Sequence, residues 1–218
     1  MTYRGKVTSS GPAEVRELAK LMITKVSVSE QDNNAYVLRC RQTDRQLLVD
    51  AADDPERVMQ VVGDDGLDVV VTTHRHWDHH RALPSVVRTT GARTAAGEED
   101  ADEMPVHVDL RLRDGDVVEF GDCRLEVIHL VGHTPGSVAL LYDDPDGSPH
   151  LFTGDSLFPG GVGTTFGDAD SFRSLLHDVR TKLFDRLPDE TWFYPGHGDD
   201  STLGAERPHL EEWASRGW

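Results

Sequence analysis

The 218-residue sequence predicts an α+β fold in which two β-sheets pack face to face and helices cover their outer surfaces. Apolar strand-like runs come first, helical stretches follow, and strands and helices then recur towards the C-terminus. Polar stretches rich in histidine, aspartate and glycine follow several of these strands. A β-sandwich flanked by helices covers both apolar faces and leaves the strand-end loops free for chemistry. We expect one domain over residues 1–218, with residues 1–12 as a loose arm.

The N-terminal half supplies most of the first predicted sheet. A short helix is expected at residues 12–21, because Pro12 can open it and Glu14 and Glu17 lie in its first turns. Asp54 and Pro55 predict the start of a helix that runs to about residue 62. Polar turns separate the early strands. The strands expected in this half are residues 23–28, 35–40, 46–51 and 69–72.

The remaining elements continue the same pattern. A helix is expected at residues 79–90, with Pro84 restricting its start and Gly91 ending it. A turn of helix is expected at 98–102, and a hairpin turn at 143–149. Two later helices are expected at 169–183 and 205–215. The further strands expected are residues 94–96, 106–109, 116–120, 124–131, 138–142, 150–153 and 191–194.

Residues 73–80 read THRHWDHH and directly follow an apolar strand. Alternate side chains of an extended segment point the same way, so His74 and His76 can share one side of a site. The adjacent Asp78 and His79 are expected to point apart where the chain turns. This density of donors predicts two neighbouring metal centres rather than a solvated loop that is His-rich by chance.

Three further candidates each follow an apolar strand and a glycine: His133 in LVGHTPGS, Asp155 in LFTGDSLF and His197 in FYPGHG. Glycine is expected where the backbone must take unusual angles to aim a side chain. Each alone is typical of an ordinary turn, but together with the cluster they indicate one shared site. The other histidines lack this context, and His150 is expected in a turn. Those left outside the metal ligands are His80, His107, His129, His150, His177 and His209.

The motifs THRHWDHH, GHTPGS, TGDSLF and PGHG, in this order, resemble the metallo-β-lactamase superfamily. Within it, the sequence is similar to glyoxalase II and its relatives, including the persulfide dioxygenases. The resemblance covers about residues 23–197 and implies an αββα sandwich with metals at one edge of the two sheets. It also implies that one metal is held by His74, His76 and His133. The second metal would be held by Asp78, His79 and His197, and Asp155 would bridge the two.

Such a ligand set suits two divalent ions, with zinc expected and iron as the alternative. Two ions about 3.5–4 Å apart can share a water and lower its pKa from near 16 towards about 7, which yields a hydroxide that can attack a carbonyl. We therefore expect a metal-dependent hydrolase, a thioesterase of glyoxalase II type, with Asp78 as a catalytic residue. The alternative is a mononuclear iron persulfide dioxygenase that uses only His74, His133 and Asp155. A metal-binding module without turnover is a further alternative.

Two departures from the family pattern bear on the substrate. β-Lactamases carry a cysteine or serine where this chain has Asp155, which argues against antibiotic hydrolysis. Glyoxalase II-like enzymes hold glutathione with a lysine and a tyrosine in a glycine loop, where the stretch GGVGTTF has Thr164 and Phe166. An anion clamp for the glutathione carboxylate is therefore missing. We expect Thr164 and Phe166 to contact a small-molecule thioester or other thiol conjugate.

Composition excludes several classes of partner. The 22 basic and 39 acidic residues give a net charge of −17, which repels nucleic-acid phosphates and anionic membranes. The two cysteines, Cys40 and Cys123, lie in apolar stretches and indicate packing rather than a disulfide scaffold. The N-terminal residues lack the apolar core of a signal peptide, and no later segment approaches a membrane span. We expect a cytoplasmic enzyme with no nucleic-acid or membrane partner, and the oligomeric state is left open.

Overall fold

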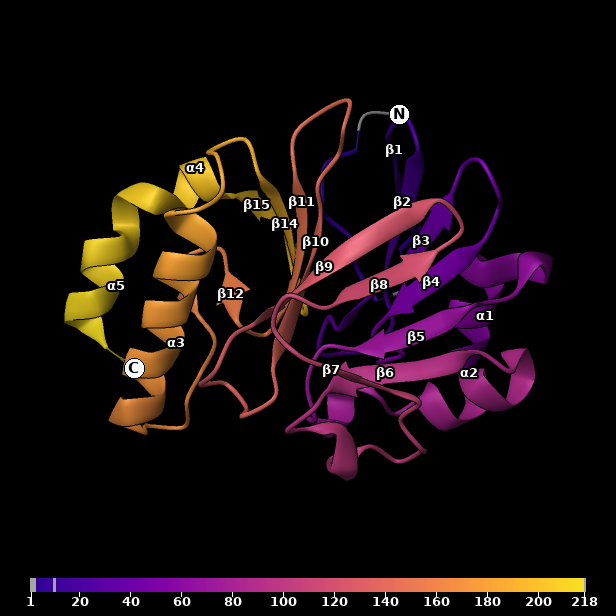
Figure 1. Ribbon diagram of the computed structural model, residues 1–218, viewed down its shortest axis with the longest axis horizontal. Helices are drawn as coiled ribbons and strands as arrows, with labels where there is room; N and C mark the ends of the chain where they lie inside the picture. Colours follow the sequence, from indigo (N-terminus) through magenta and orange to yellow (C-terminus); the bar gives the residue numbers. More distant parts are fainter. Residues whose placement is uncertain (1–2, 10, 218) are drawn as a thin grey trace.

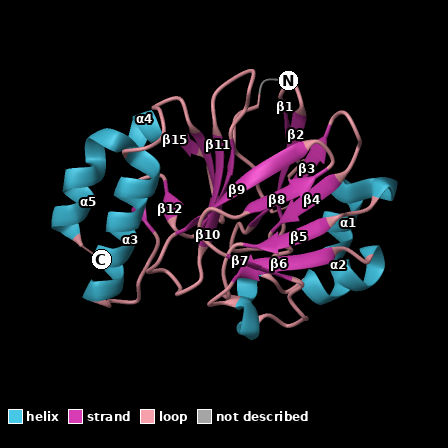
Figure 2. Cartoon of the chain, in the orientation of Figure 1, coloured by secondary structure: helices cyan, strands magenta, loops and turns pink. Residues whose placement is uncertain are grey.

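The computed structural model describes residues 3–9 and 11–217. Within them, two β-sheets lie face to face and helices cover the outer surface of each, as Figure 1 and Figure 2 show. The predicted α+β sandwich is therefore confirmed. Residues 1, 2 and 10 of the expected loose arm lie outside the described residues. The described part of the arm has no regular structure, but the Tyr3 hydroxyl donates a 2.6 Å hydrogen bond to Asp200 and anchors it.

The first sheet comes from the N-terminal half, and its strands lie side by side in the order of the chain. Neighbours are antiparallel up to the fourth strand and parallel after it, and helices supply the first two of the three parallel crossovers. The strands are β1 (Glu14–Glu17), β2 (Leu21–Ser27), β3 (Asn34–Cys40), β4 (Gln46–Val49), β5 (Val69–Thr72), β6 (Arg93–Gly97) and β7 (Leu110–Leu112). The crossover helices are α1 (Pro55–Val62) and α2 (Leu83–Thr90).

The second sheet has the strand order β15-β14-β11-β10-β9-β8. Its pairings are antiparallel except that β11 and β14 run parallel. The strands are β8 (Val117–Phe120), β9 (Cys123–His129), β10 (Val138–Tyr142), β11 (His150–Gly154), β14 (Trp192–Pro195) and β15 (Ser201–Thr202). The helices on this side are α3 (Ala169–Asp178), the π-helix η4 (Val179–Phe184), α4 (Leu203–Glu206) and α5 (Leu210–Arg216).

Short elements complete the chain. Strands β12 and β13 form a small hairpin outside both sheets. Among the described residues, the 3₁₀ turns lie in connections, and η2 carries part of the histidine cluster. These elements are β12 (Leu157–Phe158), β13 (Gly161–Val162), η1 (Gly63–Asp65), η2 (Trp77–His79), η3 (Ala101–Glu103) and η5 (Arg207–His209).

Three apolar layers hold the sandwich together. Leu38 of the first sheet and Phe152 of the second are fully buried in the layer between the sheets. Val86 of α2 lies in the layer outside the first sheet, and Leu175 of α3 in the layer outside the second. Burying one such side chain contributes about 1.5–3 kcal/mol. Each sheet therefore packs against an apolar layer on both of its faces, and the loops at the sheet edge extend from this packed core.

Two expected elements are wrong. Residues 14–17 form strand β1 rather than part of a helix at 12–21, because they pair with the free edge of β2. Tertiary pairing here outweighs the local helix signal. The strand expected at residues 106–109 is absent, and β7 begins one residue later at Leu110, where it pairs with β6. His150 is not in a turn but begins strand β11, where it is 2% exposed.

Several boundaries differ from the prediction because of proline or irregular turns. The helix expected from residue 79 begins only at Leu83, with Pro84 in its first turn, and ends at Gly91 as predicted. The helix expected at 169–183 continues as the π-helix η4. The helix expected at 205–215 is interrupted by a 3₁₀ turn that contains Pro208.

The loops that follow β5, β9, β11 and β14 converge at one edge of the sandwich. Strands β11 and β14 run parallel, so Gly154 and Pro195 pair at the same end and place Asp155 beside His197. The candidate ligands predicted from separate motifs therefore meet where strands from the two sheets end.

Candidate metal centre

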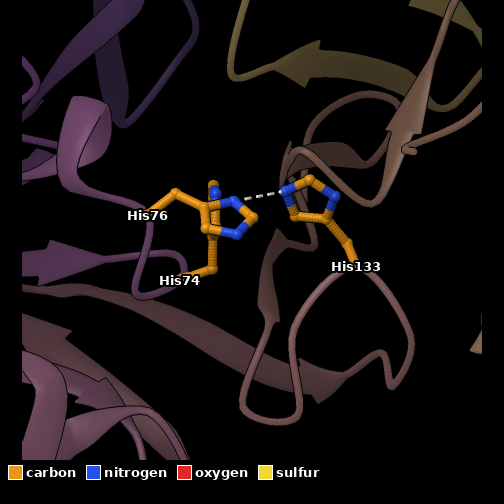
Figure 3. A group of neighbouring side chains, drawn as sticks. All are labelled: His74, His76 and His133. Atoms are coloured by element: carbon orange, nitrogen blue, oxygen red, sulfur yellow. Dashed lines mark hydrogen bonds between the residues drawn. The ribbon is translucent and has the colours of Figure 1, made fainter. Parts of the chain in front are cut away.

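Three histidines form the first half of the centre. Ligand atoms of His74, His76 and His133 all lie within 4.8 Å of one another. The closest approach is 2.9 Å, between Nδ1 of His76 and Nε2 of His133 (Figure 3). Figure 3 shows the first two rings projecting from the loop after β5 and the third from the loop after β9. We call this group the three-histidine half.

Asp78, His79 and His197 form a second group, again with ligand atoms within 4.8 Å of one another. Nε2 of His197 lies 3.2 Å from Nε2 of His79 and 3.4 Å from Oδ2 of Asp78. The expectation that Asp78 and His79 point apart where the chain turns is wrong, because the 3₁₀ turn η2 brings both side chains into this group. We call this group the aspartate half.

Asp155 lies between the two halves. Its Oδ2 is 3.7 Å from Nε2 of His133 and 3.5 Å from Nε2 of His197, while its Oδ1 is 3.3 Å from Nε2 of His79. Glycine is required beside it, since a Cβ on Gly196 would lie 2.2 Å from Asp155 Oδ1. The carboxylate is therefore placed to contact ions in both halves.

The hydrogen bonds of the rings show which nitrogen is free to bind a metal. Four histidines use Nδ1 to contact a protein oxygen: His74 with Thr73 Oγ1, His79 with Asp50 Oδ2, His133 with Thr164 O and His197 with Gln31 O, at 2.8–3.1 Å. A donor at Nδ1 leaves the Nε2 lone pair for coordination, and metal-binding histidines generally show this arrangement. Nε2 of His74 is buried and lacks a hydrogen-bond partner. The donor set of imidazoles and carboxylates fits divalent zinc or iron.

Electrostatics separate the two halves. Burial lowers the pKa of His74, His76 and His133, so these rings favour the neutral form that binds metal. The pKa of Asp78 is held below its usual range, first by its hydrogen bond with His197. The first half therefore presents neutral nitrogen donors and the second an ionised carboxylate.

The sequence prediction missed the side chains that hold these ligands. Asp50, at the end of β4, accepts hydrogen bonds from the backbone N–H and the hydroxyl of Thr73 and contacts Nδ1 of His79 at 2.9 Å. Asn33 donates through Nδ2 to Oδ2 and the backbone oxygen of Asp78, both at 3.0 Å. The signal available for Asp50 was an acidic residue ending an apolar strand. The signal for Asn33 was weaker, because it lies in an ordinary polar turn.

The remaining site predictions have clear positions. Phe166 is 74% exposed, and its ring lies 5.6 Å from the His76 ring and 6.1 Å from the His133 ring. Thr164 accepts the His133 Nδ1 hydrogen bond through its backbone oxygen. Among the described residues, the six histidines that the sequence left outside the site belong to neither half. His80 instead contacts the backbone oxygen of Arg75 through Nε2.

Comparison with known proteins gives the same picture at the level of family. Residues 29–197 match the model of the metallo-beta-lactamase superfamily. A human hydroxyacylglutathione hydrolase-like protein is 34% identical over 181 residues, which cover 81% of this chain and 59% of that protein. The hydroxyacylglutathione hydrolase of Fuscovulum blasticum is 37% identical over 173 residues, which cover 77% of this chain and 63% of that protein. The match thus spans about three fifths of these relatives.

Solved structures share the architecture. ETHE1 from Myxococcus xanthus superposes with a TM-score of 0.77 at 28% identity, covering 88% of this chain and 84% of that one. TTHA1623, solved in a di-iron-bound form, gives a TM-score of 0.70 at 30% identity, covering 84% of this chain and 96% of that one. No helix among the described residues has the length and apolar character needed to cross a bilayer. By its fold, its motifs and its sequence match, this chain belongs to the metallo-β-lactamase superfamily.

Proposed function

We propose that the chain is a metal-dependent thioesterase of glyoxalase II type that acts on a small thiol conjugate. The observation that carries this proposal is the orientation of the rings around Asp155. Four Nδ1 atoms are engaged by protein oxygens, which leaves Nε2 atoms from both halves facing one another. Such an array is costly for a protein to bury unless cations occupy it. Similarity to hydroxyacylglutathione hydrolases supports the reaction class.

In the proposed centre, each half holds one divalent ion and Asp155 contacts both. Zinc is the proposed metal, since nitrogen and oxygen donors in this number suit it and it needs no redox partner for hydrolysis. The ligands are His74, His76 and His133 in the three-histidine half, and Asp78, His79 and His197 in the aspartate half. When bound, the ions supply an activated water and polarise the scissile carbonyl.

The chain's own residues position and support this reaction. Asn33 holds the Asp78 carboxylate by a 3.0 Å hydrogen bond, so the acidic ligand keeps one orientation throughout turnover. A protein nucleophile is not needed, and both cysteines are buried in the core between or beside the strands. Hydrolysis adds water across the thioester: the carbonyl carbon gains a hydroxyl, the carbon–sulfur bond breaks, and the thiolate leaves and takes up the proton.

The approach to the centre is apolar. The Phe166 ring lies against the rings of His76 and His133, and the Phe158 ring lies 6.4 Å from the His197 ring. Residues 158–164 line a hollow of about 220 Å³, and Thr164 in its wall contacts His133 through its backbone oxygen. A hollow of this size suits a small acyl or alkyl group.

Nearby cations are already engaged by acidic residues. Arg75 lies 3.5 Å from Glu103, and Arg81 donates a 2.8 Å hydrogen bond to Asp53. Thr164, at the lysine position of glyoxalase II-like enzymes, is exposed and uncharged. We therefore propose a substrate whose thiol carrier does not depend on a carboxylate clamp, which disfavours glutathione itself.

A mononuclear iron persulfide dioxygenase is the alternative. Its ligands would be His74, His133 and Asp155 alone. The contacts of Asn33 favour it, because the Nδ2 group donates to Asp78 and lies 3.3 Å from Nε2 of His197. Asn33 thus gives two members of the aspartate half a protein partner of their own.

Steady-state kinetics of two thioesters test the proposal. The zinc-loaded chain should hydrolyse an acyl thioester of N-acetylcysteamine, which lacks carboxylates, at least as well as S-lactoylglutathione. Thr164→Lys should lower the KM for S-lactoylglutathione by roughly tenfold, since a lysine–carboxylate contact contributes about 1.5–3 kcal/mol. Thr164→Gln, of similar length but neutral, is the matched control and should change that KM by less than about twofold.

Two results would count against this proposal. A strong preference of the wild-type chain for S-lactoylglutathione would contradict the substrate assignment at Thr164. Turnover of neither thioester by protein with both halves loaded, together with oxygen consumption on a persulfide by iron-loaded protein, would favour the dioxygenase.

A further inference from the structure

A buried carboxylate that takes no part in the metal groups joins the two loops of the three-histidine half. Asp100 follows β6, is 0% exposed and lies at the start of η3. Its Oδ2 accepts a 2.9 Å hydrogen bond from the backbone N–H of Arg75, the residue between His74 and His76. The same side chain therefore lies directly behind the loop that presents two of the three histidines.

The carboxylate also holds the loop of the third histidine. Its Oδ2 accepts a 2.5 Å hydrogen bond from the hydroxyl of Thr134, and its Oδ1 accepts one of 2.9 Å from the backbone N–H of Gly136. Thr134 directly follows His133 in the chain. Three donors from two loops thus converge on one side chain.

Close packing fixes the distance between these segments. A Cβ on Gly136 would lie 2.4 Å from the backbone nitrogen of Asp100, and a Cβ on Gly97 would lie 1.9 Å from the backbone oxygen of Gly136. Real Cβ atoms do not approach other atoms so closely. The loop of His133 is therefore pressed against the Asp100 turn, with glycines at the points of contact.

The charge of Asp100 is balanced by these donors rather than by a close cation. The Arg75 guanidinium lies farther from it than these donors, with its Nε 3.9 Å from Oδ1. A buried carboxylate without a bidentate ion pair depends on the N–H and O–H groups that point at it. Conversely, those backbone N–H groups would be buried without an acceptor if the carboxylate were lost.

We propose that Asp100 is a positioning residue that sets the spacing of His74, His76 and His133 and so the metal affinity of the three-histidine half. This inference rests on the proposed role of these histidines as ligands. Among the described residues, the hydrogen bonds of the aspartate half go to Asp50, Asn33 and Gln31 instead. The effect of Asp100 should therefore be confined to one of the two ions.

Zinc affinity can be measured for each half separately in two variants that each disable the other half. Asp78→Asn weakens the aspartate half and leaves the other to be titrated, whereas His133→Ala does the reverse. Asp100→Asn keeps the shape but replaces one acceptor oxygen by an NH₂ group, which leaves a buried N–H unpaired. Added to Asp78→Asn, it should weaken zinc binding by about 10–100-fold in competition with a chromogenic chelator. Added to His133→Ala, it should change zinc binding by less than about twofold.

A control distinguishes positioning from general loss of stability. Asp109 also accepts a backbone N–H and a hydroxyl, both from Thr94, at 2.8 and 3.1 Å, at the start of β6. Asp109→Asn should lower the melting temperature without changing zinc affinity in either background. If Asp100→Asn does not fold, Thr134→Val removes one of the three donors and should weaken zinc binding in the Asp78→Asn background by a few fold.

Equal losses in both backgrounds, or no loss in the Asp78→Asn background, would overturn the role of Asp100. Failure of the proposed centre gives a different result: Asp78→Asn and His133→Ala would then each leave the zinc content of the chain unchanged. Because zinc is titrated directly, the outcome does not depend on which thioester the chain hydrolyses.

Discussion

The two halves of the candidate metal centre are held in different ways. The three-histidine half consists of neutral rings on two loops, and one buried carboxylate, Asp100, ties these loops together through backbone donors. In the aspartate half, each ligand has a separate hydrogen-bond partner: Asp50 contacts His79, and Asn33 donates to Asp78. Supports of the first kind set the distance between loops, whereas supports of the second kind set the orientation of single side chains.

A buried ion pair farther from the candidate ligands also supports the aspartate half. Lys25 and Asp200 have fully buried side chains, and the Lys25 ammonium donates a 2.7 Å hydrogen bond to the backbone oxygen of Gly198. Gly198 follows His197, so this pair holds the last ligand loop and links it to the N-terminal arm through Tyr3. A charged network thus fixes one half, while hydrogen bonds to a single carboxylate fix the other.

The largest effect is expected from the ligand that is unique to the aspartate half. Asp78→Asn removes charge at nearly constant shape. In the proposed thioesterase, kcat should fall by at least about 10²-fold, because activation of the water and its electrostatic support both depend on that half. Thioester kinetics with matched zinc loading would measure this. Near-normal thioester turnover would contradict a mechanism that needs both halves.

A smaller effect is expected when a support rather than a ligand is changed. Asp50→Asn keeps one acceptor oxygen for Thr73 but weakens the contact to Nδ1 of His79. Zinc affinity of the aspartate half, titrated in the His133→Ala background, should fall by about 10–100-fold. The loss in the Asp78→Asn background should be smaller, because Asp50 reaches His74 only through Thr73. Asp100→Asn should instead cause the larger loss of zinc affinity in the Asp78→Asn background. If both variants cause their larger loss in the same background, the two halves are not supported separately.

Much of this organisation follows from local patterns in the sequence. Strands and their polar ends predict the sandwich, and the motifs predict candidate ligands such as His74, His133 and His197, which the structure places in two adjoining groups. The supports could not be predicted in the same way. Asp100 lies in the acidic run EEDADE, where nothing local distinguishes it from its neighbours. Its role arises only because β6 ends beside the loops of the metal site.

The wrong predictions have the same origin. Residues 14–17 carry charges at helical spacing, yet they form β1 because the edge of β2 offers unpaired backbone groups. The adjacent Asp78 and His79 are predicted to point apart where the chain turns, but the turn η2 brings both into one group. Local periodicity describes segments well only where tertiary pairing does not impose another geometry.

The central claim is that both halves bind metal, and the metal content of the isolated chain tests it most directly. Protein purified anaerobically and never exposed to chelator should contain about two ions per chain, with zinc predominant, when measured by plasma emission spectroscopy. Asp78→Asn should reduce this content to about one. A content of one ion per wild-type chain, and that ion iron, would contradict the account.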